Sequence, residues 1–366
     1  MIVGLFPELE AIGGVQLAGR QTAAALASIA QERGWPCRFL SLNDPAGEHS
    51  LRVGAADFSF RGFHRSKAKF VLAGLQLARL NPHIIIAAHP NLALPVWLMR
   101  KLSTSARTAV MTHGIEVWKP LSWFRRWALR DADLVFAPST DTARKAASVQ
   151  RIKEARIRRL PWSLDPDFLA RLNGAEKSSL PAGFPEGRIL LTVGRWEASE
   201  RYKGADRLIQ AMPSLLDAVP DVHLVAVGGG DDFPRLQRIA AAQKIEGHIH
   251  FLHGLSRTEM VACYSHCDVF ALPSSGEGFG FVFLEAMASG KPVVGTYVGG
   301  VVDLVEQGVT GFLIPPREIE LLPSALIRLL TDDRLRKEMG ERARESVREK
   351  YLFERFRREL REILAL

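Results

Sequence analysis

The sequence has few cysteines and no long apolar run. Cys37, Cys263 and Cys267 are too few for a disulfide framework, and they fit a reducing compartment. No run of residues approaches the roughly 20 apolar positions that a membrane-spanning helix needs. The apolar start, residues 1–6, is too short for a signal peptide and lacks its basic residues. We therefore expect a cytoplasmic protein, bound at most peripherally to the inner face of the cell membrane.

Two cofactor patterns are incomplete. Cys263, His266 and Cys267 have helical spacing that could collect a metal, but a fourth ligand is missing, and small buried cysteines are common before a strand. A run of three glycines at 228–230 ends an apolar stretch, yet position 233 is Phe and no ribose-binding acid follows at the expected offset. This argues against a nicotinamide enzyme, and we expect neither a metal nor a cofactor.

Acidic residues are scarce in the first half of the chain. Residues 1–163 hold 23 Lys and Arg against 11 Asp and Glu, a net charge of +12, whereas the remainder has a net charge of −4. This asymmetry indicates that the first half meets an anionic partner, either a membrane surface or an anionic acceptor. Nucleic acid is not expected, because no basic motif of a nucleic-acid-binding fold is present.

Apolar runs and helical periodicity alternate along the whole chain. With 366 residues it is too long for one ordinary core. Near-continuous apolar strands separated by helices predict parallel sheets that are covered on both faces. The expected strands are residues 2–6, 37–42, 84–88, 108–112, 134–137, 189–193, 223–227, 249–252, 269–272, 293–295 and 312–314. The sequence therefore predicts two doubly wound α/β domains in series.

A stretch rich in Pro, Ser and Gly separates the two halves. It comprises residues 160–168 and 177–187, which we interpret as a hinge between domain 1–163 and domain 164–346. The tail, residues 332–366, has the pattern of one or two charged helices with an apolar stripe. Such a tail must dock on one of the domains, and its own pattern does not say which.

The second half is organised around residues 274–292, where a strand is followed by a glycine-rich turn and a helix. Gly278 and Gly280 let the backbone approach a ligand, and the first N–H groups of the helix favour an anion. Glu277 and Glu285 flank this corner. Because carboxylates only accept hydrogen bonds, they suit sugar or ribose hydroxyls.

Further candidates follow other strands, since open parallel sheets bind ligands beyond the carboxyl ends of their strands. Gly13 and Gly14 precede a helix, as in an anion corner or a plain turn. His89, Asn91 and His113 follow two strands of the first half and could bind a ligand or move a proton, although structural histidines have the same pattern.

Two cations after the first strand of the second half form another candidate. Arg195 and Lys203 could clamp a diphosphate, the guanidinium as a fork and the ammonium as a point charge. The alternative is an exposed charged loop, because Glu197, Glu200 and Arg201 lie nearby.

Tryptophans gather among basic residues at positions 118–130. Trp118, Trp123 and Trp127 are three of the seven tryptophans of the chain. This mixture suits a membrane interface. The favoured alternative is a helix that packs its aromatic face on the sheet and keeps its arginines in water.

Several motifs occur together in one order: Val-Gly-Arg at 193–195, Tyr-Lys-Gly at 202–204, the Glu277–Glu285 spacing, Gly-Lys-Pro at 290–292 and Gly-Gly at 299–300. In this combination they resemble glycosyltransferase family 4, the retaining nucleotide-sugar transferases of the GT-B fold. The resemblance covers nearly the whole chain. It implies two Rossmann-like parallel-sheet domains that face each other across a cleft, with a last helix, 347–366, that joins the first domain.

The resemblance also implies roles for the candidate residues. Arg195 and Lys203 would neutralise the donor diphosphate in place of a metal, helped by the amides of residues 278–281, Gly278, Phe279, Gly280 and Phe281. The other implied roles are ribose binding by Glu285, contacts to the donor sugar from Glu277 and His113, and loops over the donor from Gly13-Gly14 and Gly299-Gly300. His89 and Asn91 would lie on the acceptor side.

The expected function is transfer of a sugar from a UDP- or GDP-linked donor to a lipid-linked or polysaccharide acceptor in cell-envelope glycan synthesis. Three alternatives stay open. A hydrolase could use Glu277 and Glu285 as an acid/base pair, but basic clamps have no purpose there. The others are a non-hydrolysing sugar-nucleotide epimerase, which shares the fold, and a binding protein that has lost its chemistry.

Overall fold

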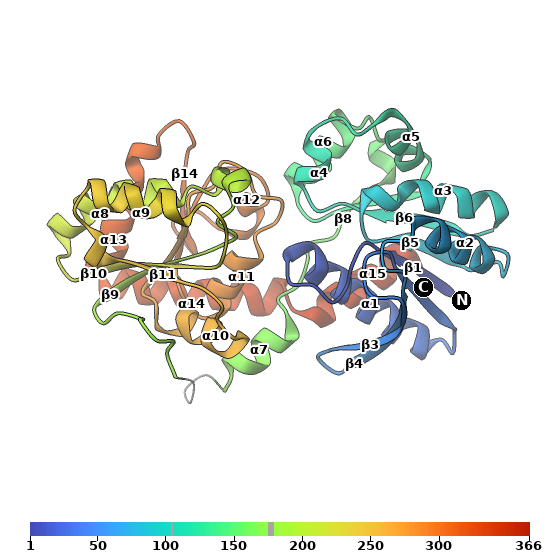
Figure 1. Ribbon diagram of the computed structural model, residues 1–366, viewed down its shortest axis with the longest axis horizontal. Coiled ribbons are helices and arrows are strands. Elements are labelled where there is room, and N and C mark those ends of the chain that lie inside the picture. The colour runs from blue at the N-terminus through green and yellow to red at the C-terminus, as the bar shows by residue number, and fades with distance from the viewer. Residues whose placement is uncertain (104, 175–178) are drawn as a thin grey trace. The chain divides into compact units, whose positions relative to one another are not determined.

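The chain divides into two compact units, which are described here separately. The computed structural model describes residues 1–103, 105–174 and 179–366. Unit 1 comprises Met1–Pro166 and Leu352–Leu366, and unit 2 comprises Asp167–Tyr351 (Figure 1). The chain thus crosses between units a few residues beyond the expected positions 163 and 346. Residues 177 and 178 of the expected hinge lie outside the described residues.

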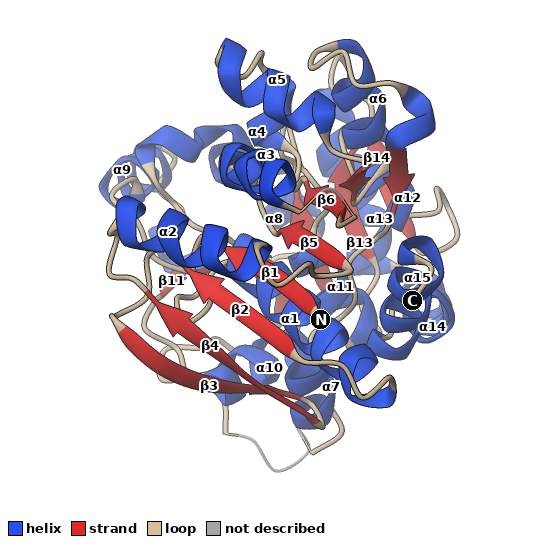
Figure 2. Cartoon of the chain, turned by 90° about the vertical axis from the view of Figure 1, so that its right-hand side faces the viewer, coloured by secondary structure: helices blue, strands red, loops and turns tan. Residues whose placement is uncertain are grey.

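Unit 1 is built on a sheet whose strands run in the order β3-β4-β2-β1-β5-β6-β7-β8. Helices α2 and α3 lie on one face of this sheet, and α1 and α15 pack together on the other (Figure 2). The strands are β1 (Ile2–Phe6), β2 (Cys37–Ser41), β3 (Gly47–Val53), β4 (Ala56–Gly62), β5 (Ile84–Ala87), β6 (Arg107–Met111), β7 (Leu134–Ala137) and β8 (Ile157–Arg159). The helices are α1 (Gly14–Glu32), α2 (Lys67–Ala78), α3 (Ala93–Leu102), α4 (Ile115–Trp118), α5 (Trp123–Asp131), α6 (Thr140–Ser148) and α15 (Phe353–Leu364).

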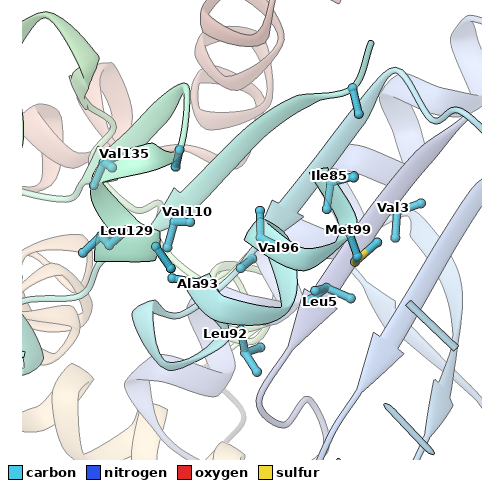
Figure 3. Close-up of a cluster of buried hydrophobic side chains, with 14 of the residues drawn as sticks. Val3, Leu5, Ile85, Leu92, Ala93, Val96, Met99, Val110, Leu129 and Val135 are labelled. Atoms are coloured by element: carbon cyan, nitrogen blue, oxygen red, sulfur yellow. The ribbon is translucent and has the colours of Figure 1, made fainter. Parts of the chain in front are cut away.

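The core of unit 1 lies between the sheet and helices α2, α3 and α5. Val3 and Ile85 project from β1 and β5 towards Val96 and Met99 of α3 (Figure 3). Leu129 extends this cluster onto α5. Apolar strand positions are thereby removed from water, which is the main favourable term in folding.

Two parts of this sheet were not expected. Strands β3 and β4 form an antiparallel hairpin that closes at Gly54, where φ is +58°. Phe58 and Phe60 of β4 are buried and alternate with exposed residues, a period of two typical of an edge hairpin. Strand β8 has a single half-buried apolar residue, Ile157, so hydrophobicity does not mark it. The expectation of a purely parallel sheet is therefore corrected for unit 1.

Unit 2 contains a parallel sheet in the order β11-β10-β9-β12-β13-β14. Its strands are β9 (Arg188–Val193), β10 (Val222–Val227), β11 (Ile249–Leu252), β12 (Val269–Leu272), β13 (Val293–Thr296) and β14 (Gly311–Ile314). Its helices are α7 (Pro166–Leu172), which begins at the crossing, α8 (Ala205–Ala218), α9 (Phe233–Ala242), α10 (Arg257–His266), α11 (Phe281–Ala288), α12 (Val301–Leu304), α13 (Leu322–Thr331) and α14 (Asp333–Lys350). Helix α8 packs on α9 and α13, whereas α11 packs on α10 and α14.

The tail is divided between the units. Helix α14 stays in unit 2, where the hydroxyl of Tyr351 donates a hydrogen bond of 2.9 Å to the carbonyl of Asp303. Helix α15 belongs to unit 1, where Arg355 donates to the carbonyl of Pro161 at 2.9 Å and Phe356 packs on Trp162. No helix among the described residues is long and apolar enough to cross a membrane.

Candidate active site

The candidate residues of unit 2 lie where its strand order reverses. Strands β9, β10 and β11 extend the sheet in one direction, and β12, β13 and β14 extend it in the other, so the reversal lies between β9 and β12. The loops beyond β9, β12 and β13 carry Arg195, Glu277 and Gly299. Ligands of open α/β sheets bind at such a point.

These loops touch through backbone atoms. The N–H of Gly300 donates to the carbonyl of Glu277 at 2.8 Å. A Cβ at Gly299 would lie 1.9 Å from that same oxygen, and a Cβ at Gly204 would lie 2.5 Å from the carbonyl oxygen of Pro273. Gly299 and Gly204 also have φ values of +59° and +77°. Glycine at these positions therefore serves the close approach of the loops.

Arg195 and Lys203 are brought together by one carboxylate. Glu200 pairs with the guanidinium of Arg195 through one oxygen and with Nζ of Lys203 through the other, at 2.7 Å. Lys203 and Glu200 are largely enclosed, whereas the side chain of Arg195 is 70% exposed. The pair thus lies beyond the carboxyl end of the central strand β9, next to the glycine-rich loop.

Glu277 lies beside this cation pair. Its carboxylate accepts hydrogen bonds from the N–H groups of Gly278 and Phe279. Burial raises the pKa of Glu277, which Lys203 opposes. The side chain of Phe279 is buried against Phe281 and Tyr351. Two of the amides expected at the donor diphosphate, those of Gly278 and Phe279, are therefore engaged by Glu277, and Phe279 also contributes packing.

Glu285 is held on α11 by a tyrosine that the sequence did not single out. The hydroxyl of Tyr264 donates to Oε2 of Glu285 at 2.7 Å. Burial, and then the neighbouring Glu285, raise the pKa of Tyr264 well above its ordinary value, so this hydroxyl stays a donor. Gly280 precedes α11 with φ of +106°, and its carbonyl accepts the N–H of Leu284 at 3.2 Å.

In unit 1 the histidines after β5 and β6 lie side by side. The rings of His89 and His113 stack at 5.6 Å, and His113 stacks on the buried Trp162 at 5.3 Å. Nε2 of His113 donates to the carbonyl of Ala88 at 2.6 Å. Burial, and then His113, lower the pKa of His89 to about 4, so His89 is neutral at neutral pH. Nδ1 of His89 accepts the N–H of Asn91 at 3.1 Å.

Gly13 and Gly14 lie at the start of α1, after the neighbouring strand β1. The loop before them is fixed by two residues that sequence reasoning missed. The carboxylate of Asp44 accepts the N–H groups of Leu9 and Glu10 at 2.8 and 3.2 Å. Arg20 donates to two carbonyls of the same loop. Because Asp44 is distant in sequence and Arg20 lies within a helix, local patterns do not reveal either contact.

The residues of the metal alternative, Cys263, His266 and Cys267, lie at the end of α10. Burial raises the pKa of both Cys263 and Cys267 to about 12, which keeps them as thiols. Nδ1 of His266 bonds the carbonyl of Ala262 at 2.9 Å. Across the described residues, no group of three His, Cys, Asp or Glu side chains is arranged to hold a metal ion.

Helix α5 has the opposite orientation to the favoured expectation. Ala128 and Leu129 face the core, whereas the side chains of Trp123 and Trp127 are 76% and 47% exposed. The tryptophans therefore do not pack on the sheet, although the rings of Trp127 and Trp97 lie 4.5 Å apart. The helix buries Ala128 and Leu129, and its large aromatic rings remain at the surface.

Known proteins resemble both halves of the chain. The family described as Glycosyltransferase Family 4 matches residues 12–168, and that described as Glycosyl transferases group 1 matches residues 180–346. A GDP-mannose-dependent alpha-(1-6)-phosphatidylinositol monomannoside mannosyltransferase of Mycolicibacterium smegmatis is 33% identical over 68% of each chain. Sulfoquinovosyl transferase SQD2 of Arabidopsis thaliana is 29% identical over 75% of this chain but only 55% of its own.

Solved structures agree over the whole length. Anabaena HepE, solved in complex with UDP, has a TM-score of 0.76 at 18% identity and covers 100% of this chain and 99% of its own. Sucrose-phosphate synthase of Thermosynechococcus elongatus has a TM-score of 0.74 at 24% identity, over 99% of this chain and 98% of its own. These similarities show the GT-B fold. With both halves matched and a relative that is 33% identical over 68% of each chain, the chain belongs to glycosyltransferase family 4 and is a glycosyltransferase.

Proposed function

We propose that this glycosyltransferase moves a sugar from a UDP- or GDP-linked donor to a lipid-linked or polysaccharide acceptor of the cell envelope, with retention and without a metal. The observation that carries the proposal is the cation pair, Arg195 and Lys203, at the strand-order reversal beside Glu277. Two cations beside loops that approach each other closely at glycine residues are suited to bind a diphosphate.

The proposed chemistry is electrostatic. As the bond between sugar and diphosphate breaks, negative charge grows on the leaving phosphate, and Arg195 and Lys203 stabilise it. The acceptor hydroxyl attacks from the face that the diphosphate leaves. Glu277 binds sugar hydroxyls, and Glu285, oriented by Tyr264, binds the ribose. His113, His89 and Asn91 remain candidates for contacts with sugar hydroxyls.

The donor and acceptor classes draw on the relatives. One relative uses GDP-mannose and acts on a phosphatidylinositol monomannoside, and HepE was solved with UDP and with UDP-glucose. We therefore infer a donor with one of these bases. A lipid-linked acceptor agrees with the basic first half and with the exposed tryptophans of α5, which we propose rest on anionic lipid.

A nucleotide panel tests the donor proposal. We expect UDP or GDP to raise the thermal midpoint of the wild-type protein, because a ligand that binds only the native state stabilises it. The matching sugar nucleotide should be slowly hydrolysed without acceptor. Lys203→Ala should lower turnover at saturating donor by about 100-fold, as expected for loss of a charge that stabilises the leaving group. Unchanged turnover in this variant would refute the assignment.

The alternatives give different outcomes in the same assays. A hydrolase would release sugar from a simple glycoside without any nucleotide, which the tie between Glu285 and Tyr264 disfavours. An epimerase would convert the sugar of the donor without an acceptor. A binding protein without chemistry would bind the nucleotide and leave the donor intact.

A further inference from the structure

Glu200 occupies a position that the proposed chemistry does not use. Each of its two carboxylate oxygens contacts one of the two proposed diphosphate ligands, Arg195 and Lys203. One carboxylate thus bridges the same two cations that two phosphate oxygens would bridge. The side chain of Glu200 is only 14% exposed, so these contacts are screened less by water than a surface ion pair.

The backbone fixes Glu200 in this place. It lies in a short 3-10 segment, Ala198–Lys203, which is kinked at Glu200, and its N–H donates to the carbonyl of Glu197 at 2.8 Å. At the start of the segment, the N–H of Ala198 donates to Asp231 at 2.6 Å. At its end, the carbonyl of Tyr202 accepts the N–H of Ser275 at 2.7 Å. Both ends of the segment are therefore anchored to neighbouring loops.

The local charges balance without any ligand. Two cations, Arg195 and Lys203, face two carboxylates, Glu200 and Glu277. Burial, and then the charges of Glu200 and Glu277, raise the pKa of Tyr202 to about 12. Both carboxylates therefore lie near the side chain of Tyr202. A diphosphate that enters here meets the repulsion of Glu200 and must take over its partners. Lys203 is enclosed, whereas Arg195 is mostly exposed.

We propose that Glu200 is an internal competitor for the diphosphate: it holds Arg195 and Lys203 in position and takes them back as the nucleoside diphosphate leaves. This inference rests on the proposed role of that cation pair. Besides stabilising the charge that grows on the leaving phosphate, the two cations also bind the product nucleotide after the transfer, which slows its release. A carboxylate that regains the cations weakens the hold on the product, and product release limits kcat in many enzymes.

The test is Glu200→Gln, which keeps the shape and removes the charge. We expect UDP or GDP, whichever the wild-type protein binds, to bind about fivefold more tightly by titration calorimetry, as for loss of one ion pair whose partner Arg195 is largely exposed. The KM for the donor should fall and kcat should fall with it, a combination that general loss of structure would not give. Glu197→Gln removes the same charge from the same loop and should change neither constant.

Weaker or unchanged nucleotide binding in Glu200→Gln would overturn the inference, because the carboxylate would then have a structural role only, or no role in nucleotide binding. Glu200→Ala is the second variant, and it must also bind more tightly if Glu200→Gln fails to fold. Lys203→Ala separates this inference from the proposed function. If Lys203→Ala loses nucleotide binding and the Glu200 variants do not gain it, only the competitor role fails. If the wild-type protein binds no nucleoside diphosphate, both fail.

Discussion

Individual residues of both units depend on partners that are distant in the sequence. Glu285 is oriented by Tyr264, and His113 is sandwiched between His89 and Trp162. The motifs identified Glu285 and His113 because they follow strands or glycine turns. Tyr264 and Trp162 lie in segments with ordinary helical or loop patterns, so single-sequence reasoning did not reveal them as partners.

The neutral His89 predicts a pH dependence. Its folded-state pKa of about 4 lies below the ordinary value of 6.5, so the unfolded chain binds the proton more readily. The stability from His89 is complete above pH 6.5 and is lost as the pH falls towards 4. We expect His89→Asn to lose less of its thermal midpoint between pH 7 and pH 4.5 than the wild-type protein. Equal losses in the two proteins would show that His89 does not contribute.

At the scale of elements, loops and helix faces decide what the site can bind. The glycine loops beyond β12 and β13 meet through Glu277 and Gly300, and α5 turns its tryptophans outward. The β-α alternation predicted which segments are strands and helices. It did not predict the β3–β4 hairpin, because these two strands alternate exposed residues with buried or half-buried ones and contain no long apolar run.

Gly299→Ala tests the contact between the loops. Its Cβ would lie 1.9 Å from a backbone oxygen at a φ of +59°, so the loops must separate. We expect this variant to lose nucleotide binding. We also expect a lower thermal midpoint, because the unfolding free energy should fall by about 2 kcal/mol or more. Gly229→Ala is the control, since a Cβ there meets nothing within 4 Å. Calorimetry measures the binding and thermal melts measure the stability. If Gly299→Ala bound the nucleotide as the wild type does, the contact between the loops would not be needed for binding.

The exposed rings of α5 predict lipid binding. Replacing Trp123 and Trp127 by Ala removes apolar area that would enter the lipid interface. We expect about tenfold weaker partitioning onto vesicles of anionic lipid in flotation assays, and weaker binding of the wild-type protein at high salt. Leu321→Ala in unit 2, also an exposed apolar side chain, should bind as the wild type does. Equal flotation of the double variant would rule out α5 as the lipid-binding surface.

At the scale of the whole molecule, the tail contributes helices to both units. Unit 1 is completed by α15, whose Phe356 is fully buried against Trp162. Arg357 and Arg361 of the same helix pair with Glu32 of α1. The first domain therefore depends on α15, which follows unit 2 in the sequence.

Phe356→Ala tests this dependence. Loss of a fully buried ring should cost about 3–5 kcal/mol of unfolding free energy. We expect hydrogen exchange to speed up in β1, α1 and α15 of unit 1, while the amides of β9 and β12 keep their protection. Phe353→Ala, at a half-buried position of the same helix, should have a smaller effect. Uniform loss of protection in both units would show that they unfold as one.

The class of the two domains, most strand positions and the set of motif residues in unit 2 follow from the amino-acid sequence alone. These depend on local periodicity and on glycines whose spacing is visible in one dimension. Four features depend on the folded chain: Glu200 bridges the two cations, Glu277 engages the amides beside it, the tail divides at Leu352, and α5 exposes its tryptophans. Each of these follows from which surfaces and charges meet after folding, and a pattern along the chain does not specify those contacts.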